Sequence, residues 1–567
     1  MTAVKTACQA RRHARLYFAR MKIFGTIFPF IETGDDNYRL GRHVANFEFL
    51  RALLTYSSFD EYHLFCLNAS HFDLTAARLK SAGIPIDKLA KVKLFLYSHL
   101  VNQITAARYH VFHCGGWGYF LAGLAYLREK HSAHFFPITG CIHSLNGMET
   151  PYHTMKVLCA PFTASDAIIC TSEAGREALM KTFQRIAGSP FGKRQSLHYR
   201  GSTAIIPLGV GEDAFSVVPR PEARRKLDIS PSAFCVLSVA RFSPSTKMDY
   251  YPLLLALAQL AQNNPRRELA VLLAGGGSDA ALRLVRAAVE EHGFRRNCRV
   301  FANFDTSLKP LLYGAADAFI ALSDNLQETF GISVVEAMAA GLPVVVSDIN
   351  GYKELIEEGL EGFKIPTTWI DSFDMADLAD IMNFDTMQLM LSQCMAVDTD
   401  AAVSALQRLM DDEPLRKSMG TKARQRAYER YRWQKIIGQY ESLWNSLQNA
   451  SPAGAGGLSG ENPFLHDYLE TFSHYPSRRI TDSDIVAITP NGTHALAQKR
   501  IPTAYADVAA IIATENVLRI LKFLAGNETT LDALCGEFSR RQWDTNRLTF
   551  TVLWMAKYGL IKIKGGA

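Results

Sequence analysis

The chain has 567 residues, of which 48% are hydrophobic and 20% charged, so it is long enough for several domains and too apolar to be disordered throughout. Its formal net charge of +6 is small for this length and does not indicate a nucleic-acid-binding protein. Ten cysteines without a Cys-x-x-Cys pair argue against a disulfide scaffold or a structural zinc site, and they favour a cytoplasmic location.

Residues 1–20 are a basic leader that precedes a second methionine, Met21. Either translation starts at Met21, or the leader is a basic surface helix that touches anionic lipid. The most apolar stretch, Val111–Leu127, is interrupted by glycines and is shorter than the roughly 20 residues of a membrane-spanning helix. We therefore expect membrane contact to be peripheral at most, at the inner face.

From Met21 onward, short β-branched or aromatic runs alternate with longer helical patterns, which is typical of parallel sheets covered by helices. The first half contains the candidate strands Lys22–Ile27, Tyr62–Leu67, Val92–Tyr97, His110–His113, His134–Ile138 and Asp166–Thr171. The second half contains Phe234–Ala240, Leu269–Ala274, Arg299–Ala302, Asp317–Leu322 and Pro343–Ser347. The pattern predicts an α/β protein of two facing, doubly wound Rossmann-like domains, residues 21–210 and 211–422, joined at Ile205–Gly211. A ligand cleft is expected between their strand ends.

Helical periodicity continues over Pro414–Leu447, and a Gly/Pro/Ser-rich linker is predicted at residues 449–463. Residues 464–567 then predict a small module of three helices and a strand, which looks like a winged helix. Residues 451–567 carry twelve basic against eleven acidic side chains, too even a balance for strong duplex binding. We expect this module to serve self-association or protein contact, and nucleic acid is an unlikely partner.

The segment Glu328–Ser347 contains the most informative motif. Thr329, Phe330 and Gly331 predict a tight turn after a strand, and a helix is expected to begin at Ile332. A helix that begins there directs unpaired N–H groups and the positive end of its dipole into the cleft, which suits a diphosphate.

Glu328 and Glu336 lie on either side of this predicted helix start, about 12 Å apart at 1.5 Å per helical residue. This separation matches the distance from a hexose to a ribose across a diphosphate. One carboxylate would bind sugar hydroxyls and the other the ribose diol. In the simpler alternative, both are solvated acids on an exposed helix.

The sequence E-T-F-G-I-S-V-V-E, followed by A-M-A-A-G-L-P-V-V-V-S, resembles the donor-site signature of the family 4 retaining glycosyltransferases, which have the two-domain GT-B fold. The resemblance extends over most of residues 21–447 and implies that residues 423–448 cross back to the N-terminal domain. It assigns donor binding to Arg241, Lys247, Gly275, Glu328, Thr329, Phe330, Gly331, Ile332 and Glu336.

The resemblance also implies that Arg241 and Lys247 bind the donor diphosphate, and that His143 lies beside the transferred sugar. Independently of the family, cations in a closed cleft stabilise the charge that develops on a departing diphosphate, so no metal is required. The catalytic set is therefore Glu328, His143, Arg241 and Lys247. His113, at the end of another predicted strand, is a further candidate, although a random histidine is more often structural.

The loop after the first strand departs from the family pattern, which often has a glycine pair there. Gly34 would bring its backbone N–H close to a phosphate or the acceptor, and Asp35 and Arg39 would contact an unusual acceptor. The same residues fit a solvated loop equally well. Two Asp-x-Asp sequences, at Asp398 and Asp482, are interpreted as capping or loop acids and not as a metal site.

These observations predict a metal-independent, retaining hexosyltransferase without a cofactor, which uses a nucleotide-diphosphate sugar as its donor substrate. The acceptor is open: a glycan, a lipid, a small molecule or a peptide. The alternatives are a nucleotide-sugar epimerase of the same architecture, or a non-catalytic sugar-binding or regulatory protein that acts through its C-terminal module.

Overall fold

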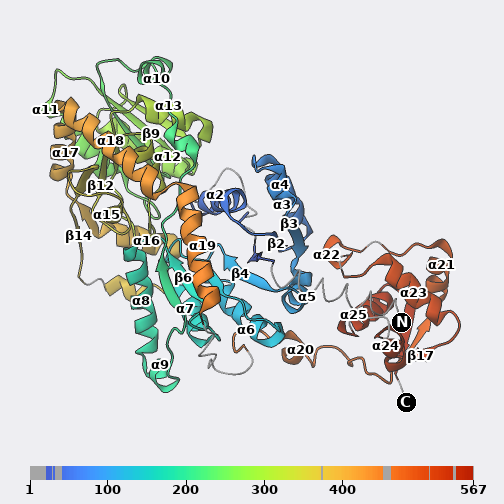
Figure 1. The fold of residues 1–567 in the computed structure, drawn as a ribbon. Helices are drawn as coiled ribbons and strands as arrows, with labels where there is room; N and C mark the ends of the chain where they lie inside the picture. Colours follow the sequence, from blue (N-terminus) through green and yellow to red (C-terminus); the bar gives the residue numbers. More distant parts are fainter. Residues whose placement is uncertain are drawn as a thin grey trace. The chain divides into compact units, whose positions relative to one another are not determined.

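The computed structural model describes residues 21–28, 30–31, 41–371, 374–450, 462–502, 504–509, 511–539 and 545–565. The chain divides into two compact units. The first spans residues 1–65, 74–94 and 103–461 and holds both parallel sheets (Figure 1). The second consists of residues 462–567 with the short segments 66–73 and 95–102.

The first sheet is parallel and forms the centre of the N-terminal lobe, with strand order β3-β2-β1-β4-β5-β6-β7. Its strands are β1 (Ile23–Ile27), β2 (Glu61–Cys66), β3 (Val92–Leu96), β4 (Tyr109–Cys114), β5 (Ile138–Cys141), β6 (Ala167–Cys170) and β7 (Ser202–Ile205). Burial of both faces explains why the central strands are almost uniformly apolar. The helices around it are α2 (Gly41–Tyr56), α3 (Ala69–Ser81), α4 (Ile86–Leu89), α5 (Leu100–Ala106), α6 (Leu121–His131), α7 (Thr150–Cys159), α8 (Glu173–Ala187) and α9 (Pro190–Arg194).

The second sheet, also parallel, forms the centre of the C-terminal lobe, with strand order β10-β9-β8-β11-β12-β13. Its strands are β8 (Phe234–Val239), β9 (Leu269–Gly275), β10 (Cys298–Ala302), β11 (Ala318–Ala321), β12 (Val344–Ser347) and β13 (Gly362–Ile365). The helices of this lobe are α10 (Arg220–Lys226), α11 (Tyr250–Asn263), α12 (Asp279–Glu291), α13 (Lys309–Ala315), α14 (Ile332–Ala339), α15 (Tyr352–Leu355), α16 (Phe384–Gln393), α17 (Thr399–Asp411) and α18 (Glu413–Arg430). Short 3-10 helices lie at Tyr97–His99, Glu212–Phe215, Thr306–Leu308 and Asp374–Leu378.

The chain returns from the C-terminal to the N-terminal lobe between α18 and α19 (Trp433–Asn449), as Figure 1 shows in orange. Helix α18 packs against α14, whereas α19 packs against α2 and β4. Trp444 of α19 is fully buried in the core of the N-terminal lobe, where its indole N–H donates to Thr139 Oγ1 at 3.1 Å. At the joint, the Val210 N–H donates to the Tyr431 carbonyl at 2.7 Å.

Each lobe contains a buried aspartate just before a central strand. Both oxygens of Asp166 accept from the guanidinium of Arg128, at 2.6 and 2.9 Å, and Oδ1 also accepts from the Ile138 N–H at the start of β5. In the other lobe, Asp317 accepts from Arg224 at 2.6 Å and from the Cys235 N–H in β8 at 2.8 Å. Each ion pair connects a helix to two neighbouring strands at the edge of the sheet where the strands begin.

The second unit contains an antiparallel sheet of order β17-β16-β18, formed by β16 (Ile485–Ile488), β17 (Thr529–Thr530) and β18 (Ile561–Lys564). Its helices are α20 (Tyr468–Thr471), α21 (Pro490–Gln498), α22 (Ala506–Ala509), α23 (Thr514–Leu524), α24 (Leu531–Ser539) and α25 (Thr545–Lys557). The three predicted helices and the final strand are present as α23, α24, α25 and β18, whereas β16, β17 and α21 were not predicted. The winged-helix interpretation and the role of this module stay predictions.

The predicted pair of Rossmann-like domains is confirmed, with two kinds of difference. The expected strand His134–Ile138 begins only at Ile138, and the edge strands β7 and β13 were missed. His113 does not face the cleft: it is 1% exposed, its Nδ1 lies 2.9 Å from Thr139 Oγ1, and aromatic rings surround it. Burial lowers the pKa of His113 to about 3, so it is a neutral core residue.

Most of the predicted linker and all of residues 1–20 lie outside the described residues. Within the part of the chain that the structure describes, no helix is both long and apolar enough to cross a membrane.

Replacing Arg128 with alanine is expected to lower the free energy of unfolding of its lobe by about 3–5 kcal/mol, because the Asp166 carboxylate would be left buried without its cation. Urea denaturation of the full-length protein measures the effect. Lys181→Ala, which breaks an exposed ion pair to Glu177 on α8, is the control and should leave the midpoint unchanged. Equal midpoints for the two variants would contradict the prediction.

Candidate donor-binding cleft

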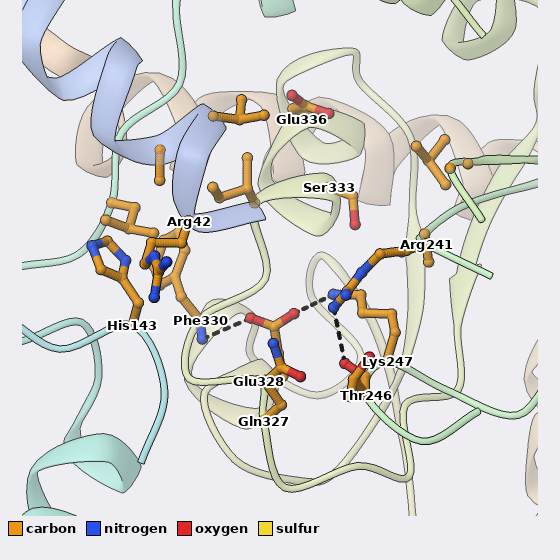
Figure 2. A pocket seen from close by; sticks show the side chains of 18 of the residues that line it. Arg42, His143, Arg241, Thr246, Lys247, Gln327, Glu328, Phe330, Ser333 and Glu336 are labelled. Carbon is orange, nitrogen blue, oxygen red and sulfur yellow. Dashed lines mark hydrogen bonds and ion pairs between the residues drawn. The ribbon is translucent and has the colours of Figure 1, made fainter. Parts of the chain in front are cut away.

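A cleft of about 550 Å³ lies between the two lobes, at the edge where the strands of both sheets end. Figure 2 shows Arg42 and His143 on the N-terminal side and Arg241, Lys247 and Glu328 on the other. Arg42 lies at the start of α2 and His143 follows β5, whereas Arg241 and Lys247 belong to the loop between β8 and α11. The cleft therefore brings together residues that are almost 300 positions apart in the sequence.

The donor turn, residues 328–331, leads directly into α14. Gly331 has φ of +113°, a conformation that L side chains rarely adopt, and a Cβ at this position would lie 2.5 Å from the Tyr352 ring. The first N–H groups of a helix have no partner within the helix, and those of α14 begin at Ile332 and Ser333, both of which line the cleft. The turn thus presents the positive end of α14 to the cavity, as the sequence predicted.

Lys247 and Glu328 form an ion pair, with 16% and 17% of their side chains exposed. Burial lowers the pKa of Lys247, but the Glu328 carboxylate outweighs this effect, and the pKa lies above its ordinary value. Burial raises the pKa of Glu328, but the charge and hydrogen bond of Lys247 outweigh this effect, so the pKa lies below its usual range. Both groups are therefore charged near neutral pH. Glu328 Oε1 also accepts from the Phe330 N–H at 3.2 Å. The N–H of Phe330, a predicted donor-binding residue, therefore already has a hydrogen-bond partner.

The β8–α11 loop, residues 240–249, is fixed by hydrogen bonds to its main chain. Four successive carbonyl oxygens each accept from a different side chain: Pro244 from Ser392 at 3.1 Å, Ser245 from Asn325, Thr246 from Arg241 at 3.2 Å, and Lys247 from Ser323 at 3.1 Å. Arg241 and Lys247 are therefore presented from a loop with little freedom, which reduces the entropy that ligand binding must overcome.

Gly275 ends β9 beside this loop and lines the cleft. A Cβ there would lie 1.8 Å from the Ala240 carbonyl oxygen, so the close approach of the β8 and β9 ends requires glycine. Gly275 faces the cleft with its main chain, and its predicted role in donor binding stays a prediction.

Glu336, on the second turn of α14, has two partners that the sequence did not predict. Its Oε1 lies 2.6 Å from Lys309 Nζ, and its Oε2 accepts from the Tyr313 hydroxyl at 3.0 Å. Burial and this carboxylate raise the pKa of Tyr313, so the hydroxyl keeps its proton and remains a donor. Lys309 begins α13, the first α-helix after β10. Residues just beyond the end of a parallel strand often bind ligands, and this position is the signal that could have identified Lys309 from the sequence.

His143 is fixed on the other side of the cleft by Asn46 and Gly115, whose oxygens lie 3.0 and 2.9 Å from Nε2. A main-chain carbonyl can only accept, so Nε2 carries the hydrogen. In the neutral ring, Nδ1 is then the acceptor nitrogen.

Thr329 and Glu354 of the C-terminal lobe hydrogen-bond to the N-terminal lobe. Thr329 Oγ1 donates to the His143 carbonyl at 2.9 Å, so this predicted donor-binding side chain links the lobes. Glu354 accepts from the N–H groups of Glu173 and Ala174, each at 2.8 Å, at the start of α8. These bonds connect the two lobes directly.

Three predicted acceptor-side residues, Gly34, Asp35 and Arg39, lie outside the described residues. Asp398 caps α17 by accepting from the Ala401 N–H at 2.9 Å, and Asp400 lies in the first turn of that helix. Among the residues that the structure describes, no three His, Cys, Asp or Glu side chains gather as they would around a metal ion.

Two family descriptions match the chain. "Glycosyltransferase Family 4" matches residues 50–189, and "Glycosyl transferases group 1" matches residues 219–383. Together they cover more than half of the sequence, one in each lobe.

Curated relatives include the D-inositol 3-phosphate glycosyltransferase of Actinosynnema mirum, 32% identical over 31% of this chain and 43% of its own. The phosphatidyl-myo-inositol mannosyltransferase of Mycobacterium tuberculosis is 32% identical over 42% of this chain and 58% of its own. The chain thus spans about half the length of the curated relatives that it matches.

Solved structures with the same fold include the HepE protein of Anabaena in complex with UDP and glucose, with a TM-score of 0.52 and 16% identity over 75% of this chain and 100% of that one. The sucrose-phosphate synthase of Thermosynechococcus elongatus has a TM-score of 0.51 and 18% identity over 76% of this chain and 100% of its own. At these identities the likeness shows the fold alone.

Asp324, 3% exposed, lies next to the loop that carries Lys247, and its carboxylate accepts from the Asp249 N–H at 3.2 Å. Burial raises the pKa of Asp324 to about 7. The unfolded chain loses this proton near pH 4 and the folded protein only near pH 7. Stability contributed by the neutral form is therefore full below pH 4 and is lost as the pH rises to 7.

We expect Asp324→Asn, which stays neutral and keeps an accepting oxygen, to be as stable as the parent at pH 4 and more stable above pH 7, by roughly 1–4 kcal/mol. Thermal denaturation between pH 4 and 8.5 measures the difference. Asp279→Asn, at the exposed start of α12, is the matched control. A constant difference between Asp324→Asn and the parent across this pH range would refute the interpretation.

Proposed function

The chain belongs to the family 4 glycosyltransferases with the GT-B fold, and we propose that it transfers a hexose from a nucleotide-diphosphate sugar to an acceptor hydroxyl, with retention of configuration at the anomeric carbon. The observation that carries this proposal is the arrangement of charge in one cleft. Two cations, Arg241 and Lys247, and the start of α14 lie together, with one glutamate on each side of the helix start. An anion that has hydroxyl groups at both ends fits this pattern.

In the proposed complex, the diphosphate lies against the first N–H groups of α14 and accepts hydrogen bonds from Arg241 and Lys247. Glu336 accepts from the ribose diol, and Glu328 accepts from hydroxyls of the transferred sugar. Each carboxylate has a lysine partner, Lys309 for Glu336 and Lys247 for Glu328, and this ion pair holds its oxygens in place as hydrogen-bond acceptors.

The reaction breaks the bond between the anomeric carbon and the diphosphate oxygen, and the electron pair stays with the departing nucleoside diphosphate. Arg241 and Lys247 stabilise the negative charge where it develops. The acceptor oxygen forms the new bond on the face that the diphosphate leaves, and its proton passes to the departing phosphate oxygen. The hydrogen bond from His143 Nε2 to the Gly115 carbonyl fixes the orientation of the imidazole ring, which would lie beside the sugar. Positive charge from side chains supports a reaction without a metal.

The acceptor site is proposed on the N-terminal side of the cleft, where Arg42 and His143 line the cavity. The relatives named for inositol 3-phosphate and phosphatidyl-myo-inositol make phosphorylated polyols the first acceptors to test. A glycan, another lipid or a peptide would be distinguished in the same panel.

We expect one nucleotide sugar in a panel of UDP, GDP and ADP sugars to raise the melting temperature clearly. At a ligand concentration 100 times its Kd, the added stability is about 2.7 kcal/mol. The corresponding nucleoside diphosphate should bind too, since it keeps the groups that face Glu336 and α14. Thermal shift with and without EDTA measures both the donor choice and its independence of metal. If no nucleotide shifts the transition, the donor assignment is wrong.

Glu328→Ala is expected to lower the slow hydrolysis of the preferred donor by at least 100-fold, because it removes the contact to the transferred sugar and the partner of Lys247. Release of nucleoside diphosphate, measured with a coupled assay, tests this. Glu290→Ala, an exposed glutamate on α12, is the matched control. The anomeric configuration of the product, determined by NMR, tests retention. Undiminished hydrolysis in Glu328→Ala would favour a non-catalytic or differently organised site.

A further inference from the structure

Helix α16 lies in a segment of the C-terminal lobe that begins and ends in a two-stranded sheet. Strands β14 (Thr367–Trp369) and β15 (Met395–Val397) pair antiparallel and bring the ends of this segment together. The Asn383 side chain caps α16 by accepting from the N–H groups of Asp385 and Thr386. The family match ends at residue 383, immediately before the helix, so the family pattern does not account for α16.

The middle of α16 is bound to the N-terminal lobe through a buried glutamine. Gln388, 5% exposed, accepts from Asn146 Nδ2 at 2.6 Å and donates to the Asn146 carbonyl at 3.4 Å. Asn146 is three residues after His143, in the loop that follows β5. Gln388 is buried and Asn146 is half-buried, so removing Asn146 leaves the Gln388 amide buried without its partner, which costs free energy.

The C-terminal end of α16, one turn after Gln388, is bound to the loop that carries Lys247. The Ser392 hydroxyl, 2% exposed, lies 3.1 Å from the Pro244 carbonyl oxygen and 2.9 Å from the Leu389 carbonyl oxygen of its own helix, so its one hydrogen is shared between the two acceptors. Gln393 donates to the Asp249 carboxylate at 3.3 Å. The same helix therefore contacts the loops of both lobes that present the proposed catalytic groups.

We propose that α16 is a strap that sets the separation between the His143 loop, residues 143–148, and the β8–α11 loop, and so positions His143 and Lys247 across the cleft. Gln388, Asn146 and Ser392 are its positioning residues, and none of them lines the cleft itself. This inference rests on the proposed function for its effect on the reaction, but the strap itself can be tested without any substrate.

Because α16 connects the two loops, losing its contact with either loop removes the connection between them. The β8–α11 loop keeps its bonds to Asn325, Arg241 and Ser323 when Ser392 is removed, so donor binding is maintained. The rate of transfer to an acceptor falls, because this step requires His143 and Lys247 to be correctly placed relative to each other. Misplacement of reacting groups by a fraction of an ångström is enough to slow a reaction substantially.

The test breaks each side of the strap in the full-length protein: Gln388→Ala on the side of the His143 loop, Ser392→Ala with Gln393→Ala on the side of the β8–α11 loop, and all three together. We expect the first two variants each to lower kcat for transfer by roughly tenfold, with the donor Kd from thermal shift changed by less than about twofold. The triple variant should be no slower than either, because a strap broken on one side is already broken. Independent losses that multiply in the triple variant would overturn the proposal. Asn146→Ala breaks the same contact from the opposite lobe and should match Gln388→Ala.

Hydrogen exchange of the protein without substrate provides the readout that does not depend on activity. In Gln388→Ala, we expect faster exchange in both loops, 143–148 and 240–249, while the sheets keep the parent rate. Gln262→Ala, an exposed glutamine on α11, is the matched control. Faster exchange confined to α16 would refute the strap. If the parent transfers no sugar from any donor, the proposed function fails, whereas the exchange result still decides whether α16 couples the two loops.

Discussion

The ion pair between Lys247 and Glu328 is the interaction on which the cleft depends. A lysine and a glutamate in a partly buried cavity are each costly alone, and together they keep each other charged. A second ion pair in the cleft joins Lys309, at the start of α13, to Glu336 of α14. Each cation that could face a phosphate and each acid that could face a hydroxyl is thus held in place before a ligand arrives, so the electrostatic field is organised in advance.

The fold supports this cleft by placing its structural charges elsewhere. Asp166 and Asp317 occupy equivalent places in the two lobes, each just before a central strand, where each binds an arginine and a strand N–H. Because parallel strands all end at the same edge, the opposite edge carries the ion pairs that hold the layers together. The edge with the strand ends is left for loops whose residues bind ligands.

Much of this organisation could be predicted from short-range patterns. The central strands are continuous apolar runs, and the donor turn follows from a strand, a glycine and a helix start in succession. The edge strands β7 and β13 were missed because polar residues or glycine, Ser202 and Thr203 in β7 and Gly362 and Lys364 in β13, leave no continuous apolar run. The partners of Glu336 and His143 are distant in sequence, so no local pattern connects them. The contacts of α16 involve glutamine, serine and asparagine, whose side chains give no sequence signal of what they bind.

The contacts of Thr329 and Glu354 with the N-terminal lobe have a consequence for turnover. Thr329 belongs to the turn that would hold the spent nucleotide, yet its hydroxyl is bonded to the main chain of the histidine loop. The lobes therefore cannot part without breaking that bond and releasing the carboxylate of Glu354 from the first turn of α8. Under the proposed function, separation of the lobes would loosen the donor turn at the same time, so release of the nucleotide and entry of the next acceptor would share one motion.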